Sequence, residues 1–302
     1  MLSATSPYSV IEADEFDRSF HQLTPYIAVV NATDPDHLDI YGTEEAYLES
    51  FAHFTELIRP DGFLVVHTGL KLVPRPPQGV RTYTFSRNEG DFHAENIRMG
   101  NGTIFFDFVY PDGKITDIEL GVPVEINIDN ALAALAAVWL TGTLSPELAR
   151  KAISTYPGVE RRFEFHLKEN HHGGRVVIDD YAHHPDELKS SIRSVRALYP
   201  DRRLTVAFQP HLYSRTRDFA LEFAEALSLA DEVILTDIYP AREAPIPGVT
   251  SKIIFDNIKI SDKIMISKED FVNTMKNRKF EVLLTLGAGN LSLEVPRLVK
   301  EL

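Results

Sequence analysis

Residues 163–286 repeat one pattern: a short apolar segment, a few polar or turn residues, and a stretch whose apolar residues recur every three or four positions. The short apolar segments, which we expect to be strands, are residues 163–167, 176–180, 204–208, 233–237, 263–266 and 282–286. Helical spacing lies between several of them, as in Leu188, Ile192 and Val195. Strands that alternate with helices of this length predict an α/β fold with a mainly parallel, doubly wound sheet.

The first part of the chain has a less regular pattern. The segments expected as strands are residues 8–12, 26–31, 63–66 and 83–85. A helix is expected over residues 43–58, with Thr43 at its start. Over residues 92–120 apolar and polar residues alternate, and turn residues interrupt them at 100–102 and 111–113. This part therefore predicts antiparallel strands attached to the first sheet.

Two helices and a turn close the first part. They are expected over residues 127–140 and from Pro146 onward, where proline suits the first position of a helix. The Pro157–Gly158 pair follows these helices and is typical of a boundary between two domains. We therefore predict two domains, residues 1–157 and 158–302.

Composition excludes several classes of function. The 302 residues are 44% hydrophobic, which is enough for two ordinary cores, and no apolar run approaches the roughly 18 residues that cross a bilayer, so membrane insertion is not expected. The chain has no cysteine, which excludes disulfides, thiolate metal sites and cysteine nucleophiles, and suits a reducing cytoplasm. A net charge of −13 argues against nucleic acid as a partner.

Titratable residues follow the expected strand that ends at Asp180. Next come Tyr181, His183 and His184, before a helix that begins with acidic residues. Ligands of doubly wound sheets bind beyond the carboxyl ends of the strands, so these groups lie where a polar ligand would lie. The alternative is that the acidic residues favour the helix start and the histidines fill a polar loop.

The expected strand 204–208 is followed by His211 and then by Arg215 and Arg217 near a helix start. Fixed positive charge and free backbone N–H groups together form an anion-binding arrangement. The alternative is that the arginines lie on the surface beside an ordinary helix cap. The glycines of residues 287–290 indicate a turn that is by itself more typical of close packing than of phosphate binding.

Two further pairs lie in the first part. Glu12 and His37 each follow an expected strand, and carboxylate is the ligand that Mg²⁺ prefers, whereas imidazole is less usual. Asn127 and Asn130 are three positions apart at a helix start, so they share one face. Their amides can pair with an adenine edge, although capping the helix is the more common use of such residues.

Taken together, these segments resemble the Mur ligases, and within that family the branch that joins L-alanine to UDP-N-acetylmuramate in peptidoglycan precursor synthesis. The matching segments are Glu-Ala-Asp-Glu-Phe-Asp at 12–17, Asp-His-Leu-Asp at 36–39, Asn127 with Asn130, Gly-Val-Glu-Arg-Arg-Phe-Glu at 158–164, Asp-Tyr-Ala-His-His-Pro at 180–185, Gln-Pro-His at 209–211, Ser-Arg-Thr-Arg-Asp at 214–218 and Asp-Ile-Tyr-Pro-Ala-Arg-Glu at 237–243. Each match alone is weak evidence for the family. Eight matches that occur in the order in which the family has them are strong evidence.

The resemblance implies a fold for each domain and a ligand that each domain binds. Residues 1–157 would be part of a P-loop-type ATPase central domain, with a parallel sheet and a small antiparallel sheet, and residues 158–302 a Rossmann-like domain that binds the amino acid. Among the matching residues, those implied to bind ATP are Asn127, Asn130, Arg162 and Asp180. Those implied to hold Mg²⁺ are Glu12 and His37.

The resemblance also implies the groups around the new bond. His183, His211 and Arg215 would be catalytic, and together with Tyr181 and Arg217 they would bind UDP-N-acetylmuramate and L-alanine. The implied reaction makes an acyl phosphate from ATP and the lactyl carboxylate, which the amine of L-alanine then attacks.

The sequence departs from the family pattern in three places. No Gly-x-x-x-x-Gly-Lys-[Ser/Thr] loop occurs in the 302 residues, so the UDP-binding domain and the phosphate-gripping loop are expected upstream of this segment. We therefore expect the chain alone to be inactive unless a complementing N-terminal fragment is supplied. Leu212 stands where many relatives have a basic residue, and Asn290 where they commonly have aspartate.

Other interpretations stay open at this stage. A ligase that recycles murein peptides shares the scaffold, as does a folylpolyglutamate-type ligase, but the 183–184 and 209–211 segments favour the alanine-adding branch. A non-catalytic remnant that binds a nucleotide or a protein partner is the alternative from another class.

Overall fold

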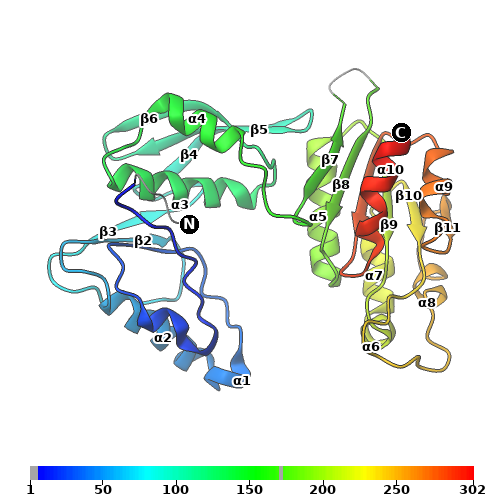
Figure 1. Ribbon diagram of the computed structural model, residues 1–302, viewed down its shortest axis with the longest axis horizontal. Helices are drawn as coiled ribbons and strands as arrows, with labels where there is room; N and C mark the ends of the chain where they lie inside the picture. The colour runs from blue at the N-terminus through cyan, green and yellow to red at the C-terminus, as the bar shows by residue number, and fades with distance from the viewer. Residues whose placement is uncertain (1–5, 170–172) are drawn as a thin grey trace. The chain divides into compact units, whose positions relative to one another are not determined.

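The computed structural model describes residues 6–169 and 173–302 and divides into two compact units (Figure 1). The first consists of Met1–Ile97, Phe106–Ile118 and Ile126–Ile153, and the second of Arg98–Phe105, Glu119–Glu125 and Ser154–Leu302. The main change of unit therefore falls between Ile153 and Ser154, a few residues before the Pro157–Gly158 pair that the sequence indicates. None of the described helices is long and apolar enough to cross a membrane.

The second unit is built on a six-stranded sheet with the order β11-β10-β9-β12-β8-β7. Its strands are β7 (Glu164–Lys168), β8 (Val176–Asp180), β9 (Leu204–Phe208), β10 (Glu232–Leu235), β11 (Lys263–Met265) and β12 (Val282–Leu286). The five strands from β8 onward are parallel, and β7 pairs with β8 in the antiparallel sense at one edge. The predicted doubly wound α/β fold is confirmed.

Helices cover both faces of this sheet. They are α5 (Pro185–Leu198), α6 (Tyr213–Asp218), α7 (Ala220–Leu227), α8 (Lys252–Phe255), α9 (Phe271–Lys276), the 3-10 turn η2 (Leu291–Glu294) and α10 (Val295–Glu301). On one face Phe271 of α9 and Leu298 of α10 pack against Ala207 of β9. On the other face the neighbouring strand residue, Phe208, contacts Phe223 of α7. Because successive strand residues point to opposite faces, α7 and α10 lie on opposite sides of the sheet.

This arrangement creates a topological switch point between two adjacent strands. The chain leaves β9 toward α6 and α7 on one face, and it leaves neighbouring β12 toward η2 and α10 on the other (Figure 1). Connections that diverge in this way leave a crevice beyond the carboxyl ends of the two strands, which is where such sheets bind ligands. The segments after Phe208 and Leu286 border this crevice.

The first unit contains a three-stranded parallel sheet with the order β1-β2-β3. The elements around it are η1 (Phe16–Gln22), β1 (Ile27–Val30), α1 (Leu38–Tyr41), α2 (Glu44–Glu56), β2 (Phe63–His67) and β3 (Arg81–Phe85). The Thr43 hydroxyl accepts a hydrogen bond from the Ala46 N–H at 3.2 Å and so begins α2, as the sequence predicts. Phe20, Phe54 and Leu64 are buried in its core.

One predicted strand is wrong. Residues 8–12 have no regular secondary structure, and Val10 and Ile11 are exposed. An apolar segment becomes a strand only where a neighbouring strand pairs with it and a core takes its side chains, and here neither is present among the described residues.

The alternating residues 92–120 form a small sheet of their own instead of extending the parallel one. Its strands are β4 (His93–Gly100), β5 (Thr103–Tyr110) and β6 (Gly113–Glu119), joined in sequence by the two predicted tight turns. The helices α3 (Ile126–Leu140) and α4 (Pro146–Ser154) follow. Trp139 of α3 contacts the rings of Tyr83, Phe92 and Tyr110, so aromatic packing connects the two sheets where we expected strand pairing.

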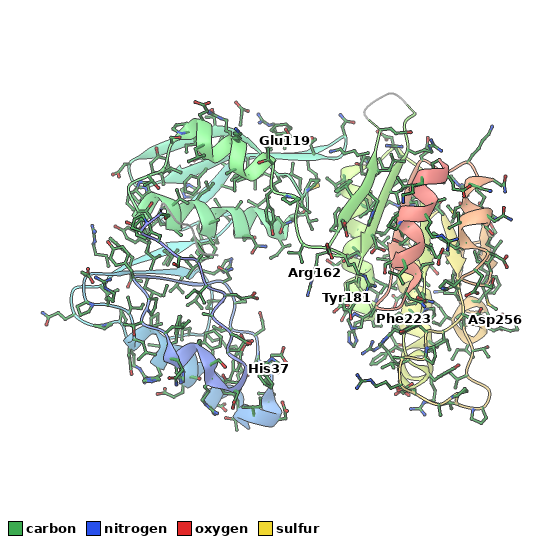
Figure 2. All side chains as sticks on the ribbon, in the orientation of Figure 1. His37, Glu119, Arg162, Tyr181, Phe223 and Asp256 are labelled. Atoms are coloured by element: carbon green, nitrogen blue, oxygen red, sulfur yellow. The ribbon has the colours of Figure 1, made fainter. Side chains whose placement is uncertain are left out.

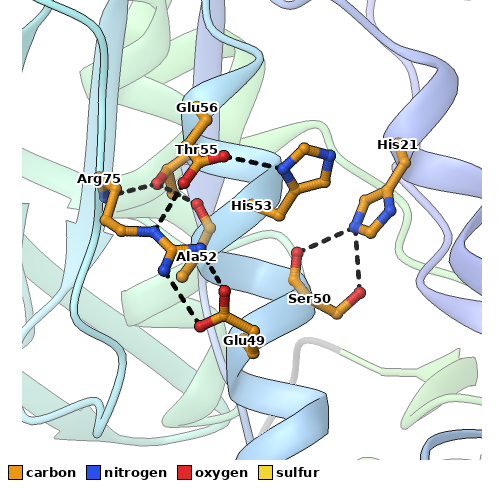
Figure 3. A network of polar contacts seen from close by, with 8 residues as sticks. All are labelled: His21, Glu49, Ser50, Ala52, His53, Thr55, Glu56 and Arg75. Atoms are coloured by element: carbon orange, nitrogen blue, oxygen red, sulfur yellow. Dashed lines mark hydrogen bonds and ion pairs between the residues drawn. The ribbon is translucent and has the colours of Figure 1, made fainter.

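A network of polar contacts fixes the surface of α2 (Figure 3). Arg75 donates to both carboxylate oxygens of Glu49, at 3.1 and 2.6 Å, and its Nε lies 2.7 Å from Glu56. At the other side of the helix, the His21 ring lies 2.9 Å from the Ser50 carbonyl oxygen and 3.0 Å from its hydroxyl. These contacts tie η1 and the loop after β2 to one helix, and exposed ion pairs of this kind stabilise mainly as a network.

Candidate active site

Two loops approach each other very closely at the switch point. Gln209 directly follows β9 and is buried, and its side-chain oxygen accepts the Leu291 N–H at 2.8 Å. Gly287 and Gly289, after β12, lie against it: a Cβ on Gly287 would stand 2.5 Å from the Gln209 carbonyl oxygen, and one on Gly289 would overlap the Gln209 amide. The glycines predicted as a weak turn are therefore required by the approach of two loops.

Arg161 holds the glycine turn in place. One of its terminal nitrogens donates to the carbonyl oxygens of Gly287 at 2.7 Å and of Gly289 at 3.0 Å. Its guanidinium lies over the Tyr181 ring, 4.7 Å from the centroid. Its Nε is 3.8 Å from the buried carboxylate of Asp179, and neither atom has a hydrogen-bond partner in the described part of the chain. Arg161 thus connects the start of the unit with the ends of β8 and β12.

The two aspartates that end β8 are both pushed toward the neutral form. Burial raises the pKa of Asp179, against the Thr285 hydroxyl and the Arg161 charge, which favour the carboxylate. Burial also raises the pKa of Asp180, against hydrogen bonds from Ser191 and the backbone. Asp180, which the resemblance assigns to the nucleotide, is therefore turned toward Ser191 of α5 within its own unit.

Three of the predicted catalytic side chains come together at the crevice. The His183 and His211 ring centroids are 6.2 Å apart, and a terminal nitrogen of Arg215 lies 3.3 Å from Nδ1 of His211. Burial, and then the Arg215 charge, lowers the pKa of His211. Burial and the same arginine lower the pKa of His184, whose ring is 4.7 Å from His183. Burial and a neighbouring fixed cation thus favour the neutral forms of His184 and His211, and the cation suits an anionic ligand.

The segment after β10 packs against the loop that carries His211. The Tyr239 ring stacks on His211 with centroids 5.7 Å apart. Glu243 accepts hydrogen bonds from the hydroxyl and the backbone N–H of Ser214, and these bonds lower the pKa of Glu243. Leu212, which follows His211 in the chain, has a positive φ of 70° and donates its N–H to the Tyr239 carbonyl oxygen at 3.0 Å. The loop that carries His211 is therefore fixed by the segment after β10.

Other predicted residues of the second unit are not part of the group. Arg217 is exposed and pairs with Asp218 at 2.7 Å. Arg162, labelled with Tyr181 in Figure 2, is also exposed. Their contacts with substrate and nucleotide remain predictions. Both side chains are exposed, so a bound ligand could reach them.

Of the four predicted residues of the first unit, only the two asparagines contact each other. Asn130 donates to the Asn127 side chain at 3.0 Å at the start of α3. Glu12 is exposed, and His37, labelled in Figure 2, lies at the start of α1 against the Phe16 ring and 3.8 Å from the Asp36 carboxylate. Among the described residues, no group of three or more His, Asp or Glu side chains could hold a metal by itself. A Mg²⁺ there would thus need phosphate oxygens and water to complete its shell, as this ion commonly does.

Sequence reasoning missed two residues that organise the site. Arg161 and Tyr239 both lie in the quoted segments 158–164 and 237–243, but only the neighbouring Arg162 received a role. Of the two adjacent arginines, the one that packs inward is decided by the left-handed backbone at Arg161, which has a φ of 58°. No residue pattern signals that conformation outside glycine, asparagine and aspartate.

Comparison with known proteins agrees with this geometry. Residues 1–138 match the Mur ligase middle domain, and residues 161–289 match the Mur ligase, glutamate ligase domain. The chain belongs to the Mur ligase family. It is 57% identical over 299 residues to the UDP-N-acetylmuramate–L-alanine ligase of Phocaeicola vulgatus, and 48% identical over 294 residues to that of Porphyromonas gingivalis. It covers 99% and 96% of its own length in these alignments but only 64% of each relative.

Solved structures share the fold of this Mur ligase chain. The UDP-N-acetylmuramate-alanine ligase of Thermotoga maritima superposes with a TM-score of 0.73 at 24% identity, over 94% of this chain and 61% of that one. A folylpolyglutamate synthase from the same organism gives 0.67 at 17% identity, over 92% and 61%. The predicted fold class, a parallel sheet with a small antiparallel sheet followed by a doubly wound domain, is confirmed.

Replacing Arg161 with alanine should lower the free energy of unfolding of the second unit by about 3 kcal/mol, because it removes two charge-assisted hydrogen bonds and leaves the Asp179 carboxylate without its cation. Urea unfolding followed by far-ultraviolet circular dichroism measures this. The adjacent variant Arg162→Ala is the control and should change stability by less than about 0.5 kcal/mol. Equal effects of the two substitutions would contradict the assigned role of Arg161.

The lowered pKa values of His184 and His211 predict a pH dependence. In the unfolded chain these histidines take up protons near their ordinary pKa of 6.5, whereas the folded chain resists protonation until a lower pH. The unfolded state therefore binds more protons between the folded pKa values and 6.5, and stability falls as the pH falls through that window.

The double variant His184→Gln, His211→Gln should lose less stability than the natural chain between about pH 7 and about pH 5.5, as measured by urea unfolding. Asn257→Gln, at an exposed residue that does not titrate, is the control and should leave the dependence unchanged. An unchanged slope in the double variant would mean that the site does not keep these imidazoles neutral.

Proposed function

We propose that this chain is the ATP- and amino-acid-binding part of a ligase that joins L-alanine to the lactyl carboxylate of UDP-N-acetylmuramate, in peptidoglycan precursor synthesis in the cytoplasm. The observation that carries the proposal is the group formed by His183, His211 and Arg215 at the switch point of the second unit. Identity of 57% to a ligase with that name supports the choice of substrates.

The second unit offers the chemistry that amide formation needs. Arg215 is a fixed cation beside His211, and Arg161 lies close enough to lower the pKa of His211 as well. These cations suit the carboxylate of L-alanine and the negative charge that develops at the acyl phosphate. Tyr181 and Arg217 at the rim would add contacts to the bound substrates.

The first unit is assigned to the nucleotide. The paired amides of Asn127 and Asn130 lie at a helix start, where they can exchange their mutual hydrogen bond for bonds to the adenine edge. Arg162 and Asp180 are also assigned to the nucleotide in this proposal. Glu12 and His37 would each hold a Mg²⁺, which neutralises phosphate oxygens when bound.

The reaction proceeds in two steps in this proposal. The lactyl carboxylate takes the γ-phosphoryl group of ATP, which leaves ADP and an acyl phosphate. The amine of L-alanine then attacks the acyl carbon, and the carbon–oxygen bond to phosphate breaks. Positive side chains that stabilise charge in both steps supply most of the rate enhancement in such transfers.

Two other functions differ from this one in their substrates. A murein-peptide ligase would use a whole peptide in place of L-alanine on the same scaffold. A non-catalytic remnant would bind nucleotide, or a cell-wall protein, without turnover. Dependence of phosphate release on a peptide would favour the first, and nucleotide affinity without any turnover in a complemented chain would favour the second.

Nucleotide binding is the first test. Isothermal calorimetry with ATP or ADP and Mg²⁺ should give measurable binding, weakened at least about tenfold in Asn130→Ala and in Asp180→Ala. Asn257→Ala and Asp256→Ala, on an exposed part of the second unit, are matched controls and should bind as the natural chain does. Binding that survives both site variants would contradict the assigned nucleotide contacts. Absence of binding in the natural chain would favour the non-catalytic remnant over the ligase.

Turnover is the second test. The 302-residue chain holds no Gly-x-x-x-x-Gly-Lys-[Ser/Thr] loop, which supplies the backbone cradle and lysine for phosphates. Alone it should therefore show no steady phosphate release that depends on ATP, UDP-N-acetylmuramate and L-alanine, and a supplied N-terminal fragment with that loop should restore it. The full-length Phocaeicola vulgatus ligase serves as the positive control. Steady release by the chain alone would contradict this part of the proposal.

A further inference from the structure

We infer that Glu187 is a positioning residue for His183, which it holds in the tautomer that carries its proton on Nδ1 and offers Nε2 as a proton acceptor at the crevice. The inference concerns a carboxylate to which no role has been given so far. Its consequence for catalysis rests on the proposed function, but the tautomer itself does not.

The contacts of Nδ1 decide the tautomer. Nδ1 of His183 lies 3.0 Å from the Tyr181 carbonyl oxygen and 3.4 Å from a carboxylate oxygen of Glu187. A carbonyl oxygen only accepts hydrogen bonds, and so does an ionised carboxylate. A lone pair on Nδ1 would face both oxygens, so Nδ1 carries the hydrogen and, in the neutral ring, Nε2 carries the lone pair.

Glu187 is ionised and fixed in place. The oxygen that faces His183 also accepts the backbone N–H groups of His183 at 2.8 Å and His184 at 3.1 Å, as the reciprocal part of a capping box at the start of α5. Burial acts to raise the pKa of Glu187, but the two N–H donors outweigh it and the pKa is lowered. Glu187 thus ties the backbone and the ring of the same histidine to the helix start.

Three aromatic rings surround His183. The Tyr181 ring packs against the imidazole with the ring centroids 5.1 Å apart. His184 and His211 approach at 4.7 and 6.2 Å, and both have lowered pKa values. Arg215, beyond His211, adds the positive charge of the group. Nε2 has no hydrogen-bond partner among the described residues.

A fixed lone pair at this position has a defined use in the proposed reaction. L-alanine enters with an ammonium group, which cannot attack until it loses a proton. Nε2 of His183 takes that proton, and the neutral amine attacks the acyl carbon. The bond from that carbon to the phosphate oxygen breaks, the phosphate leaves with the second amine proton, and the imidazolium later returns its proton to water. Glu187 stabilises that imidazolium, as carboxylates do beside catalytic histidines.

Nuclear magnetic resonance of the chain labelled with ¹⁵N-histidine tests the inference without substrate. Cross-peak patterns in long-range ¹⁵N–¹H spectra report which ring nitrogen carries the proton. The natural chain should show His183 protonated on Nδ1, and Glu187→Gln should lower the ratio of the Nδ1–H to the Nε2–H form about fivefold, because one charge-assisted hydrogen bond is lost. Glutamine can still accept the two backbone N–H groups, so the helix start is retained.

Asp186→Asn is the matched control, since it removes the same charge from the same turn of α5 at an exposed side chain. It should leave the His183 tautomer unchanged, and unchanged signals from His166 of β7 in both variants show that the fold of the second unit is intact. An Nε2–H form of His183 in the natural chain, or the same ratio in Glu187→Gln, would overturn the inference. Failure of the ligase assay with an Nδ1–H form present would instead reject the proposed function alone.

Discussion

The close approach of two loops at the switch point is the constraint on which the rest of the second unit depends. The buried amide of Gln209 fills the space between the ends of β9 and β12, and the two glycines after β12 leave room for it. Arg161 fixes the glycine turn by donating hydrogen bonds to the carbonyl oxygens of both glycines. His211 takes its position from this contact because it lies two residues after Gln209, and Arg161 extends the contact to Tyr181 after β8.

Charge in the crevice follows from the same packing. Backbone carbonyl oxygens fix Arg161, and Arg215 lies beside His211; burial together with the Arg215 charge lowers the pKa of His184 and His211. Glu187 then separates the two ring nitrogens of His183 into a donor and an acceptor. The chain is acidic overall, with a net charge of −13, yet two arginines are held at the candidate site beside the carboxylates. Local placement of side chains, more than net charge, therefore decides what can bind there.

Periodicity predicts the second unit well, because its strands are buried on both faces and are limited by turn residues. β8, β9 and β12 begin and end at the predicted residues. The expected strand at 8–12 is wrong because pairing and burial are tertiary properties that an isolated apolar run does not contain. In the site, the strand-end rule finds His183 and His211, whereas it cannot choose between Arg161 and Arg162. That choice depends on one backbone angle, and the tautomer of His183 depends on a contact four residues away.

Contact between the glycine turn and Gln209 holds His183, His211 and Arg215 together in this account, and the variant Gly289→Ala tests it most directly. A Cβ at this position overlaps the Gln209 side-chain amide, so the amide must shift away from the Leu291 N–H that it accepts. We predict a lower urea midpoint for the second unit, shifted ring signals of His211 and His183, and an unchanged fluorescence spectrum of Trp139 in the first unit. Unaltered histidine signals and an unaltered midpoint would contradict the account.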